Sequence, residues 1–229
     1  MKRVILFASL GLATGLAGAP VPKPTTKERI ETIYGKLQDP EGKCVFQLDG
    51  TKLTVDLPGG KEYMCHLGEQ NVPRLTRKVE GDFIVTVKCS AALPKDAKPA
   101  EGKWAEVGCG LYIRPKVGYV NRYGLSDFIY ESEKQTKHHQ VVIGPISTGP
   151  SGQHYKDSTN TIYVRFSRIG QLTEYSTSAD GKKFTRIFWS TTDTGEAYEL
   201  GVYACSNCTT ETRAVLEDFK LELIKAEKK

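Results

Sequence analysis

The sequence has little of several features that would point to common protein classes. Its 229 residues include only 2 Trp and 2 Met. After the N-terminal segment, no apolar run is long enough to span a bilayer as a helix. The 32 Lys and Arg and the 27 Asp and Glu are interspersed, and no arginine-rich run occurs. A nucleic-acid-binding role, which needs a basic stripe, therefore has little support.

Common catalytic and metal-binding motifs are also missing. No G-x-S-x-G nucleophile elbow occurs. Cys205 and Cys208 form a lone C-x-x-C, whereas a zinc ribbon needs a second pair. His138 and His139 are adjacent, so on a strand their rings would point to opposite faces. The sequence predicts no metal and no cofactor.

One metal site remains as an alternative. Oxygen ligands from both ends of the chain could meet at the rim of a sheet protein and hold Ca²⁺. The candidates are Asp39, Glu41 and Asp218. Capping of a turn by Asp39 is the competing interpretation.

The first 19 residues have the pattern of a secretory signal peptide. Lys2 and Arg3 precede an apolar run, and small residues follow it. Cleavage after Ala17 or after Ala19 fits the pattern, and an uncleaved membrane anchor is the alternative. The protein is therefore expected to be secreted or periplasmic, with no stable membrane span once the signal is removed.

A proline-rich linker at 20–27 separates this segment from a single domain at 28–229. Residues 27–37 have apolar side chains at helical spacing, and Thr25 or Thr26 can serve as the N-cap. The sequence therefore predicts a short N-terminal helix.

Residues 161–189 carry the clearest strand pattern. Val164 and Phe166 alternate with Tyr163 and Arg165, as in a strand with one buried face. Asp180-Gly181 is a hairpin-turn signal. This stretch is expected to form three consecutive strands, with Tyr163 and Arg165 pointing away from the core.

Similar patterns extend over the rest of the domain. Further strands, or pairs of strands, are expected at 44–60, 72–93, 104–114, 118–133, 137–144, 198–206 and 214–227. Residues 61–72 are expected to be a loop, and 144–158 a glycine-rich mobile loop. About a dozen strands without an internal repeat indicate an all-β fold of two packed antiparallel sheets.

Six cysteines in an exported protein could form three disulfides in 15 ways. Cys89 and Cys109 fall on neighbouring predicted strands at core-facing positions and are the first expected pair. For Cys205 and Cys208, a local disulfide and free thiols are both open.

Several of these stretches, in this order, resemble a known family. They are DPEGKC (39–44), LTVDLPGG (53–60), PRLTRKVEGDFIVTVK (73–88), GCGLYIR (108–114), GYVNRYG (118–124), YVRFSRIGQLTEYSTSADGKKFTRI (163–187) and ELGVYACS followed by LEDFKLEL. The chain is similar to bacterial secreted proteins of the concanavalin A-like lectin/glucanase superfamily, in a family labelled "regulation of enolase 1"-like. The resemblance implies a jelly-roll β-sandwich whose concave sheet often receives carbohydrate.

The resemblance also raises the alternative of a glycoside hydrolase or lyase. Hydrolases with this fold commonly use an E-x-D-x-x-E strand, and no such string occurs here. Glu131 and Glu133 come nearest, but the third acid is missing. An enzyme is therefore less well supported than a binding module.

Sugar recognition needs aromatic faces for stacking and planar polar groups for hydroxyls. Six residues of these types are expected to point away from the core on nearby strands: Tyr112, Arg114, Asn121, Tyr123, Tyr163 and Arg165. They form the predicted ligand site, with a glycan or another cell-envelope ligand as the expected partner. A structural or protein-binding envelope protein is the remaining alternative.

Overall fold

The computed structural model is an all-β protein with one short helix. It describes residues 25–64, 71–102, 104–116, 120–130, 138–145, 160–191 and 197–225. The predicted signal peptide and nearly all of the linker lie outside these residues, as do Glu131, Glu133 and the interior of the predicted glycine-rich loop. No helix in the described part of the chain is long and apolar enough to cross a membrane.

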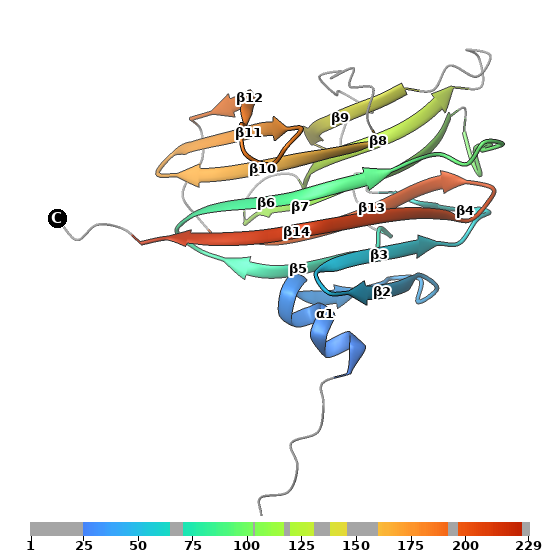
Figure 1. The fold of residues 1–229 in the computed structure, drawn as a ribbon, viewed down its shortest axis with the longest axis horizontal. Helices are drawn as coiled ribbons and strands as arrows, with labels where there is room; N and C mark the ends of the chain where they lie inside the picture. The colour runs from blue at the N-terminus through green and yellow to red at the C-terminus, as the bar shows by residue number, and fades with distance from the viewer. Residues whose placement is uncertain are drawn as a thin grey trace, which may run out of the picture.

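Two antiparallel sheets of seven strands each make up the molecule (Figure 1). Sheet A contains β1 (Lys36–Gln38), β4 (Lys61–Tyr63), β5 (Arg74–Val79), β7 (Trp104–Pro115), β8 (Asn121–Tyr130), β9 (His138–Pro145) and β13 (Tyr198–Cys208). Sheet B contains β2 (Val45–Asp49), β3 (Lys52–Leu57), β6 (Asp82–Ala91), β10 (Thr161–Ile169), β11 (Leu172–Ser178), β12 (Thr185–Ser190) and β14 (Thr212–Ile224). The chain crosses repeatedly between the sheets, as in a jelly roll.

In sheet A the strand order is β1-β5-β13-β7-β8-β9, and β4 also pairs with β13. In sheet B the order is β12-β11-β10-β6-β14-β3-β2. The predicted three-strand meander is confirmed as β10, β11 and β12. Residues 118–133 were expected to form a strand pair, but the described part is one continuous strand, β8. Part of the expected loop at 61–72 is the strand β4.

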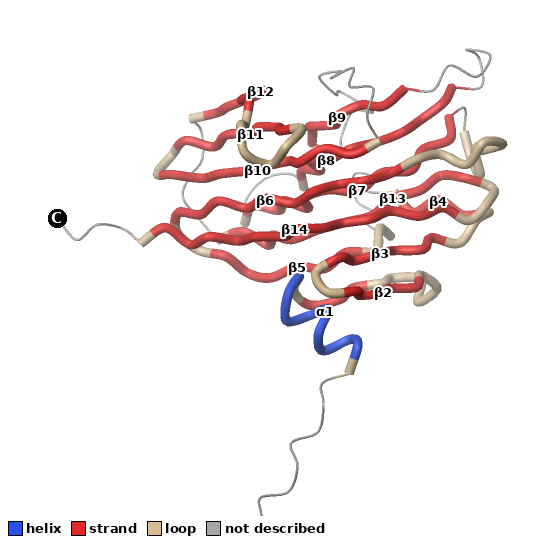
Figure 2. Tube along the Cα trace, viewed as in Figure 1, coloured by secondary structure: helices blue, strands red, loops and turns tan. Residues whose placement is uncertain are grey.

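Helix α1 (Thr26–Tyr34) packs at one end of the sandwich (Figure 2). Thr25 is the N-cap and forms a capping box with Glu28. The buried Tyr34 side chain donates its hydroxyl to the carbonyl oxygens of Thr51, at 2.6 Å, and Leu216, at 3.0 Å. The predicted helix is therefore confirmed, although it ends earlier than expected because Gly35 turns the chain at φ 107° into β1.

The core lies between the two sheets and follows the alternation in the sequence. Every second residue of β6 and of β10 is buried. Phe166 of β10 packs against Phe83, with ring centroids 5.8 Å apart, and against Tyr198 of sheet A, at 6.1 Å. The aromatic rings thus join the sheets across the core.

The cysteines that the structure describes are free thiols: Cys44, Cys89, Cys109, Cys205 and Cys208. Cys89 and Cys109 are neighbours in the core, and burial together with the hydrogen bond between the two thiols raises the pKa of Cys89. The expected disulfide between them is therefore not supported. A local bridge from Cys205 to Cys208 is not supported either, since they face opposite sides of β13 and belong to separate apolar clusters.

Candidate functional site

The six predicted site residues do not share one face of the sandwich. Tyr112 and Arg114 lie on the outer face of sheet A, whereas Tyr163 and Arg165 lie on the outer face of sheet B. Tyr123 points into the core, opposite Leu111, and its hydroxyl donates to the carbonyl oxygen of Ser176 at 2.6 Å.

The expectation that Tyr123 points outward is therefore wrong. Asn121 lies opposite the buried Ile113 at the start of β8 and is half-buried. Both residues occupy register positions that face sheet B rather than the outer surface. The six residues therefore do not form one ligand site, because the outward-facing ones are divided between the outer faces of sheets A and B.

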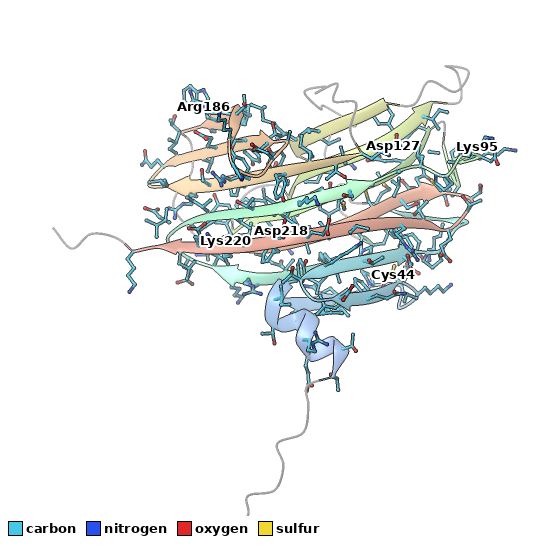
Figure 3. All side chains as sticks on the ribbon, viewed as in Figure 1. Cys44, Lys95, Asp127, Arg186, Asp218 and Lys220 are labelled. Atoms are coloured by element: carbon cyan, nitrogen blue, oxygen red, sulfur yellow. The ribbon has the colours of Figure 1, made fainter. Side chains whose placement is uncertain are left out.

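On the outer face of sheet B, Tyr163 holds a turn in place. Its hydroxyl donates to Oδ2 of Asp218 at 2.8 Å, and this bond raises the pKa of Tyr163. Asp218 sits at a β-bulge of β14 with φ 53°, near Lys220 (Figure 3). Gly181 lies directly over the Tyr163 ring, where an added Cβ would be only 2.9 Å from it. Tyr163 therefore packs against the chain itself.

Arg165 has a similar supporting role. Its guanidinium lies 3.5 Å from the centre of the Phe184 ring, and its Nε donates to Thr86. Asp180 caps the turn between β11 and β12. Hydrogen bonds from the backbone of Lys183 and Lys182 lower the pKa of Asp180 to about 2. This side of the predicted site is a folded and internally satisfied turn.

Tyr163→Phe is expected to lower the free energy of unfolding by about 1 kcal/mol or less, because it removes one partly exposed hydrogen bond. Urea denaturation measures this change. Ser167→Ala, on the same face of β10, is the matched control and should shift the free energy by less than about 0.5 kcal/mol. A larger effect from the control would contradict the assigned role.

The outer face of sheet A carries a hydrogen-bonded group, here called the polar network: Gln38, Arg74, Thr76, Arg114 and Glu199. Oε1 of Glu199 accepts from Oγ1 of Thr76 at 2.7 Å and from Nε2 of Gln38 at 3.1 Å. Oε2 of Glu199 is 3.5 Å from a terminal nitrogen of Arg114. Arg74 donates to Oε1 of Gln38 at 2.7 Å. Side chains from β1, β5, β13 and β7 are thereby fixed together.

Electrostatics keep the carboxyl of Glu199 ionised. Partial burial alone would raise its pKa, but hydrogen bonds from Thr76 and Gln38 and the charges of Arg74 and Arg114 outweigh burial. The pKa of Glu199 consequently lies below its ordinary value. At neutral pH the network therefore combines one carboxylate with two guanidinium cations.

Strand register explains why these residues meet. Lys78, Glu199 and Arg114 are directly opposite one another across β5, β13 and β7. Directly opposite residues point to the same face of a sheet. Three segments far apart in the sequence thus place charged side chains in one row.

Beside the network, the same face holds a buried ion pair. Arg122 donates to Oε1 of Glu106 at 2.9 Å, and Ser126 donates to the same oxygen at 2.7 Å. The Sγ atom of Cys205 lies 4.0 Å from that oxygen. Gly108 makes room for the group, since an added Cβ would be 2.6 Å from the Ser126 hydroxyl oxygen. This buried ion pair therefore helps to stabilise the outer face of sheet A.

Tyr112 lies next to this buried group and is itself fully buried. It belongs to a small apolar cluster with Met64, Val72, Val120, Tyr203 and Cys205. Arg74 covers its ring, with the guanidinium carbon 5.5 Å from the ring centre. The ring of Tyr112 is consequently not available for sugar stacking, contrary to the prediction, and of the predicted pair only Arg114 reaches the surface.

The geometry does not pair Glu106 with Glu199 for hydrolysis. Glu199 lies opposite Arg114, which is eight residues along β7 from Glu106. Eight residues of strand span about 26 Å. Two catalytic carboxyl groups of a glycosidase stand about 5–9.5 Å apart. These two carboxylates therefore cannot act on one glycosidic bond.

The alternative calcium site is not supported. Among the described residues, no group of three or more His, Cys, Asp or Glu could hold a metal ion. Asp39 accepts from the backbone N–H of Cys44 at 2.9 Å, as expected for turn capping. Glu41 pairs with Lys61, and Asp218 accepts from Tyr163.

The sequence patterns missed Gln38, Arg74, Thr76 and Glu199. A local signal existed for Glu199, because it stands between the buried Tyr198 and Leu200 and must point outward. Gln38 has no local signal, because its strand partner Arg74 lies 36 positions away in the chain. Alternation could thus have found Glu199 but not the network.

Comparisons with known proteins show a likeness in fold, but they show no family for this chain. No protein-family model matches the chain, and no curated protein matches its sequence. A functionally unknown protein from Saccharomyces cerevisiae has a similar structure, with a TM-score of 0.54 and 11% identity over 83% of this chain and 97% of that chain.

Two further solved structures show weaker likeness. The alginate lyase from Klebsiella pneumoniae has a TM-score of 0.41 and 11% identity over 78% of this chain and 84% of that chain. The exoplasmic/lumenal domain of VIP36 has a TM-score of 0.43 and 10% identity over 85% of each chain. The predicted fold class, an all-β sandwich of two antiparallel sheets with a short N-terminal helix, is confirmed.

Proposed function

We propose that this protein binds carbohydrate, without catalysis, at the polar network on the outer face of sheet A. One observation carries the proposal: planar hydrogen-bonding groups from four strands are fixed together at a partly exposed surface. Arg114 is the most open of them, with 53% of its side chain exposed. Groups of this kind suit the neighbouring hydroxyls of a sugar, and their existing hydrogen bonds reduce the entropy lost on binding.

The proposal also includes where the protein acts and what it is related to. Its N-terminal pattern supports secretion or a periplasmic location. The ordered motifs support relationship to the bacterial family labelled "regulation of enolase 1"-like. These two statements rest on the sequence and are tested by detection of the processed protein outside the cytoplasm and by comparison with close homologues.

Arg114→Ala is expected to weaken binding to a recognised glycan at least tenfold while the melting temperature stays within about 2 °C, because an exposed ion pair contributes little to stability. A pull-down with insoluble polysaccharides and a glycan array identify the ligand, and titration calorimetry measures the affinity. The native protein binding no glycan in any of these assays would overturn the proposed function.

Arg186→Ala is the matched control. Arg186 is 56% exposed and lies 3.6 Å from Glu174 on the outer face of sheet B, so it resembles the Arg114–Glu199 pair in exposure and distance. Glycan binding should survive this change. If Arg186→Ala abolished binding and Arg114→Ala did not, the site would lie on sheet B.

A further inference from the structure

At the exposed Arg114–Glu199 edge, the polar network presents more donor groups than acceptor groups. Both oxygens of Glu199 already face donors of the protein, from Thr76, Gln38 and Arg114. The guanidinium of Arg114 has five N–H donors, and one of its terminal nitrogens makes the 3.5 Å contact with Glu199. A ligand that approaches this surface therefore meets mainly hydrogen-bond donors.

The charges at this end of sheet A are also mainly positive. Lys36 lies opposite Thr76, and Lys78 lies opposite Glu199, so both side chains point to the outer face. Both lysines are exposed, and in the part of the chain that the structure describes no ion pair joins either of them to an acid. Arg114 and Lys78 flank Glu199 from the two neighbouring strands. Glu199 is thus the one carboxylate in this row of three charges.

The spacing of the cations suits a polymer with repeated charge. Lys78 and Arg114 are on strands separated by β13, and two strand spacings place their backbones about 10 Å apart. Arginine binds carboxylate or sulfate groups through two parallel hydrogen bonds, whereas lysine adds a point charge. One end of this face can therefore bind more than one anionic group of the same ligand polymer.

From the donor excess and the row of cations we infer that the ligand is an acidic polysaccharide, whose carboxylate or sulfate groups bind Arg114 and Lys78. This inference rests on the proposed function and narrows its ligand class. Sugar hydroxyls can also accept from Arg114, but two cations beside one engaged carboxylate make this row net positive, which favours an anionic ligand. Glu199 positions Arg114 through their ion pair, while Lys78 is left exposed on the neighbouring strand.

Affinity electrophoresis and titration calorimetry of the purified protein test the inference. The probes are polygalacturonate and its fully methyl-esterified form, and dextran sulfate and unmodified dextran. Binding to polygalacturonate but not to its ester identifies carboxylates, and binding to dextran sulfate but not to dextran identifies sulfates. Arg114→Gln should reduce the affinity for the acidic probe at least tenfold, and Arg114→Lys should restore part of it.

The control is Arg186→Gln, which removes the same charge from the other face of the sandwich. An equal loss of affinity from Arg114→Gln and Arg186→Gln would mean non-specific attraction to a basic protein and would overturn the inference. Equal binding of the acidic and neutral forms would overturn it too, while the proposed function would stand. Failure of every acidic and neutral glycan would overturn both.

Discussion

Glu106→Ala is expected to lower the free energy of unfolding by about 3–5 kcal/mol, because it breaks a buried ion pair and leaves the guanidinium of Arg122 without its carboxylate. The side chains of Glu106 and Arg122 are only 4% and 10% exposed. Ser126 would lose its acceptor at the same time. Urea denaturation followed by circular dichroism measures the loss.

A paired substitution separates the ion pair from the burial of its atoms. Glu106→Met together with Arg122→Met removes both charges and keeps the volume, so the double variant should be more stable than Glu106→Ala. Glu106→Gln keeps an acceptor for Ser126 and should fall between the native protein and the alanine variant. A single alanine variant as stable as the native protein would show that the pair is not buried in solution.

Phe166→Ala is expected to lower the free energy of unfolding by about 3–5 kcal/mol, as large-to-small substitutions of buried phenylalanine do. Phe166 is 1% exposed, and its ring lies 4.8 Å from that of Tyr175 and 6.1 Å from that of Tyr198. The substitution would open a cavity between the two sheets. Thermal and urea unfolding both report the change.

Phe188→Ala is the control for this prediction. Phe188 touches the same aromatic group, with its ring 5.7 Å from Tyr175, but it is 44% exposed on the edge strand β12. Its removal should cost about 1 kcal/mol or less, since nearly half of its surface already contacts water. Similar losses from both variants would place the core elsewhere.

Local patterns were sufficient where one face of a strand is buried and the other is not. In β6 and β10 the alternation of apolar residues predicted the inward set, including Cys89, Val164 and Phe166. The capping residues around Thr25 predicted the helix for the same reason, because capping involves neighbours in the chain. Fold class followed from these local signals.

The error at β8 has a specific cause. A pair of strands was expected at 118–133, yet the chain continues as one strand there, with Gly124 opposite Gly110. An added Cβ on Gly124 would be 2.1 Å from the carbonyl oxygen of Cys109, so glycine serves close strand approach here and not a turn. With the turn misplaced, the inward side of β8 could not be assigned, and Tyr123 was placed on the wrong face.

The candidate site was harder to predict, because it depends on which strands are neighbours. Arg114 was recognised from alternation within β7. Its partner Glu199 is 85 positions away and meets it only because β13 pairs with β7. Strand order and register between distant segments are set by the whole core, and a single sequence does not contain them as a local pattern.

The position of the last two strands has a consequence for how the protein is made. β13 lies between β5 and β7, and β14 lies between β3 and β6, so each sheet is completed at its interior by residues 198–224. During synthesis the earlier strands emerge first and wait with unpaired edges, which are prone to aggregation. Neither sheet can close until this stretch has left the ribosome. Folding of the sandwich is therefore expected to await synthesis of this stretch, and a chaperone that shields strand edges should raise the yield.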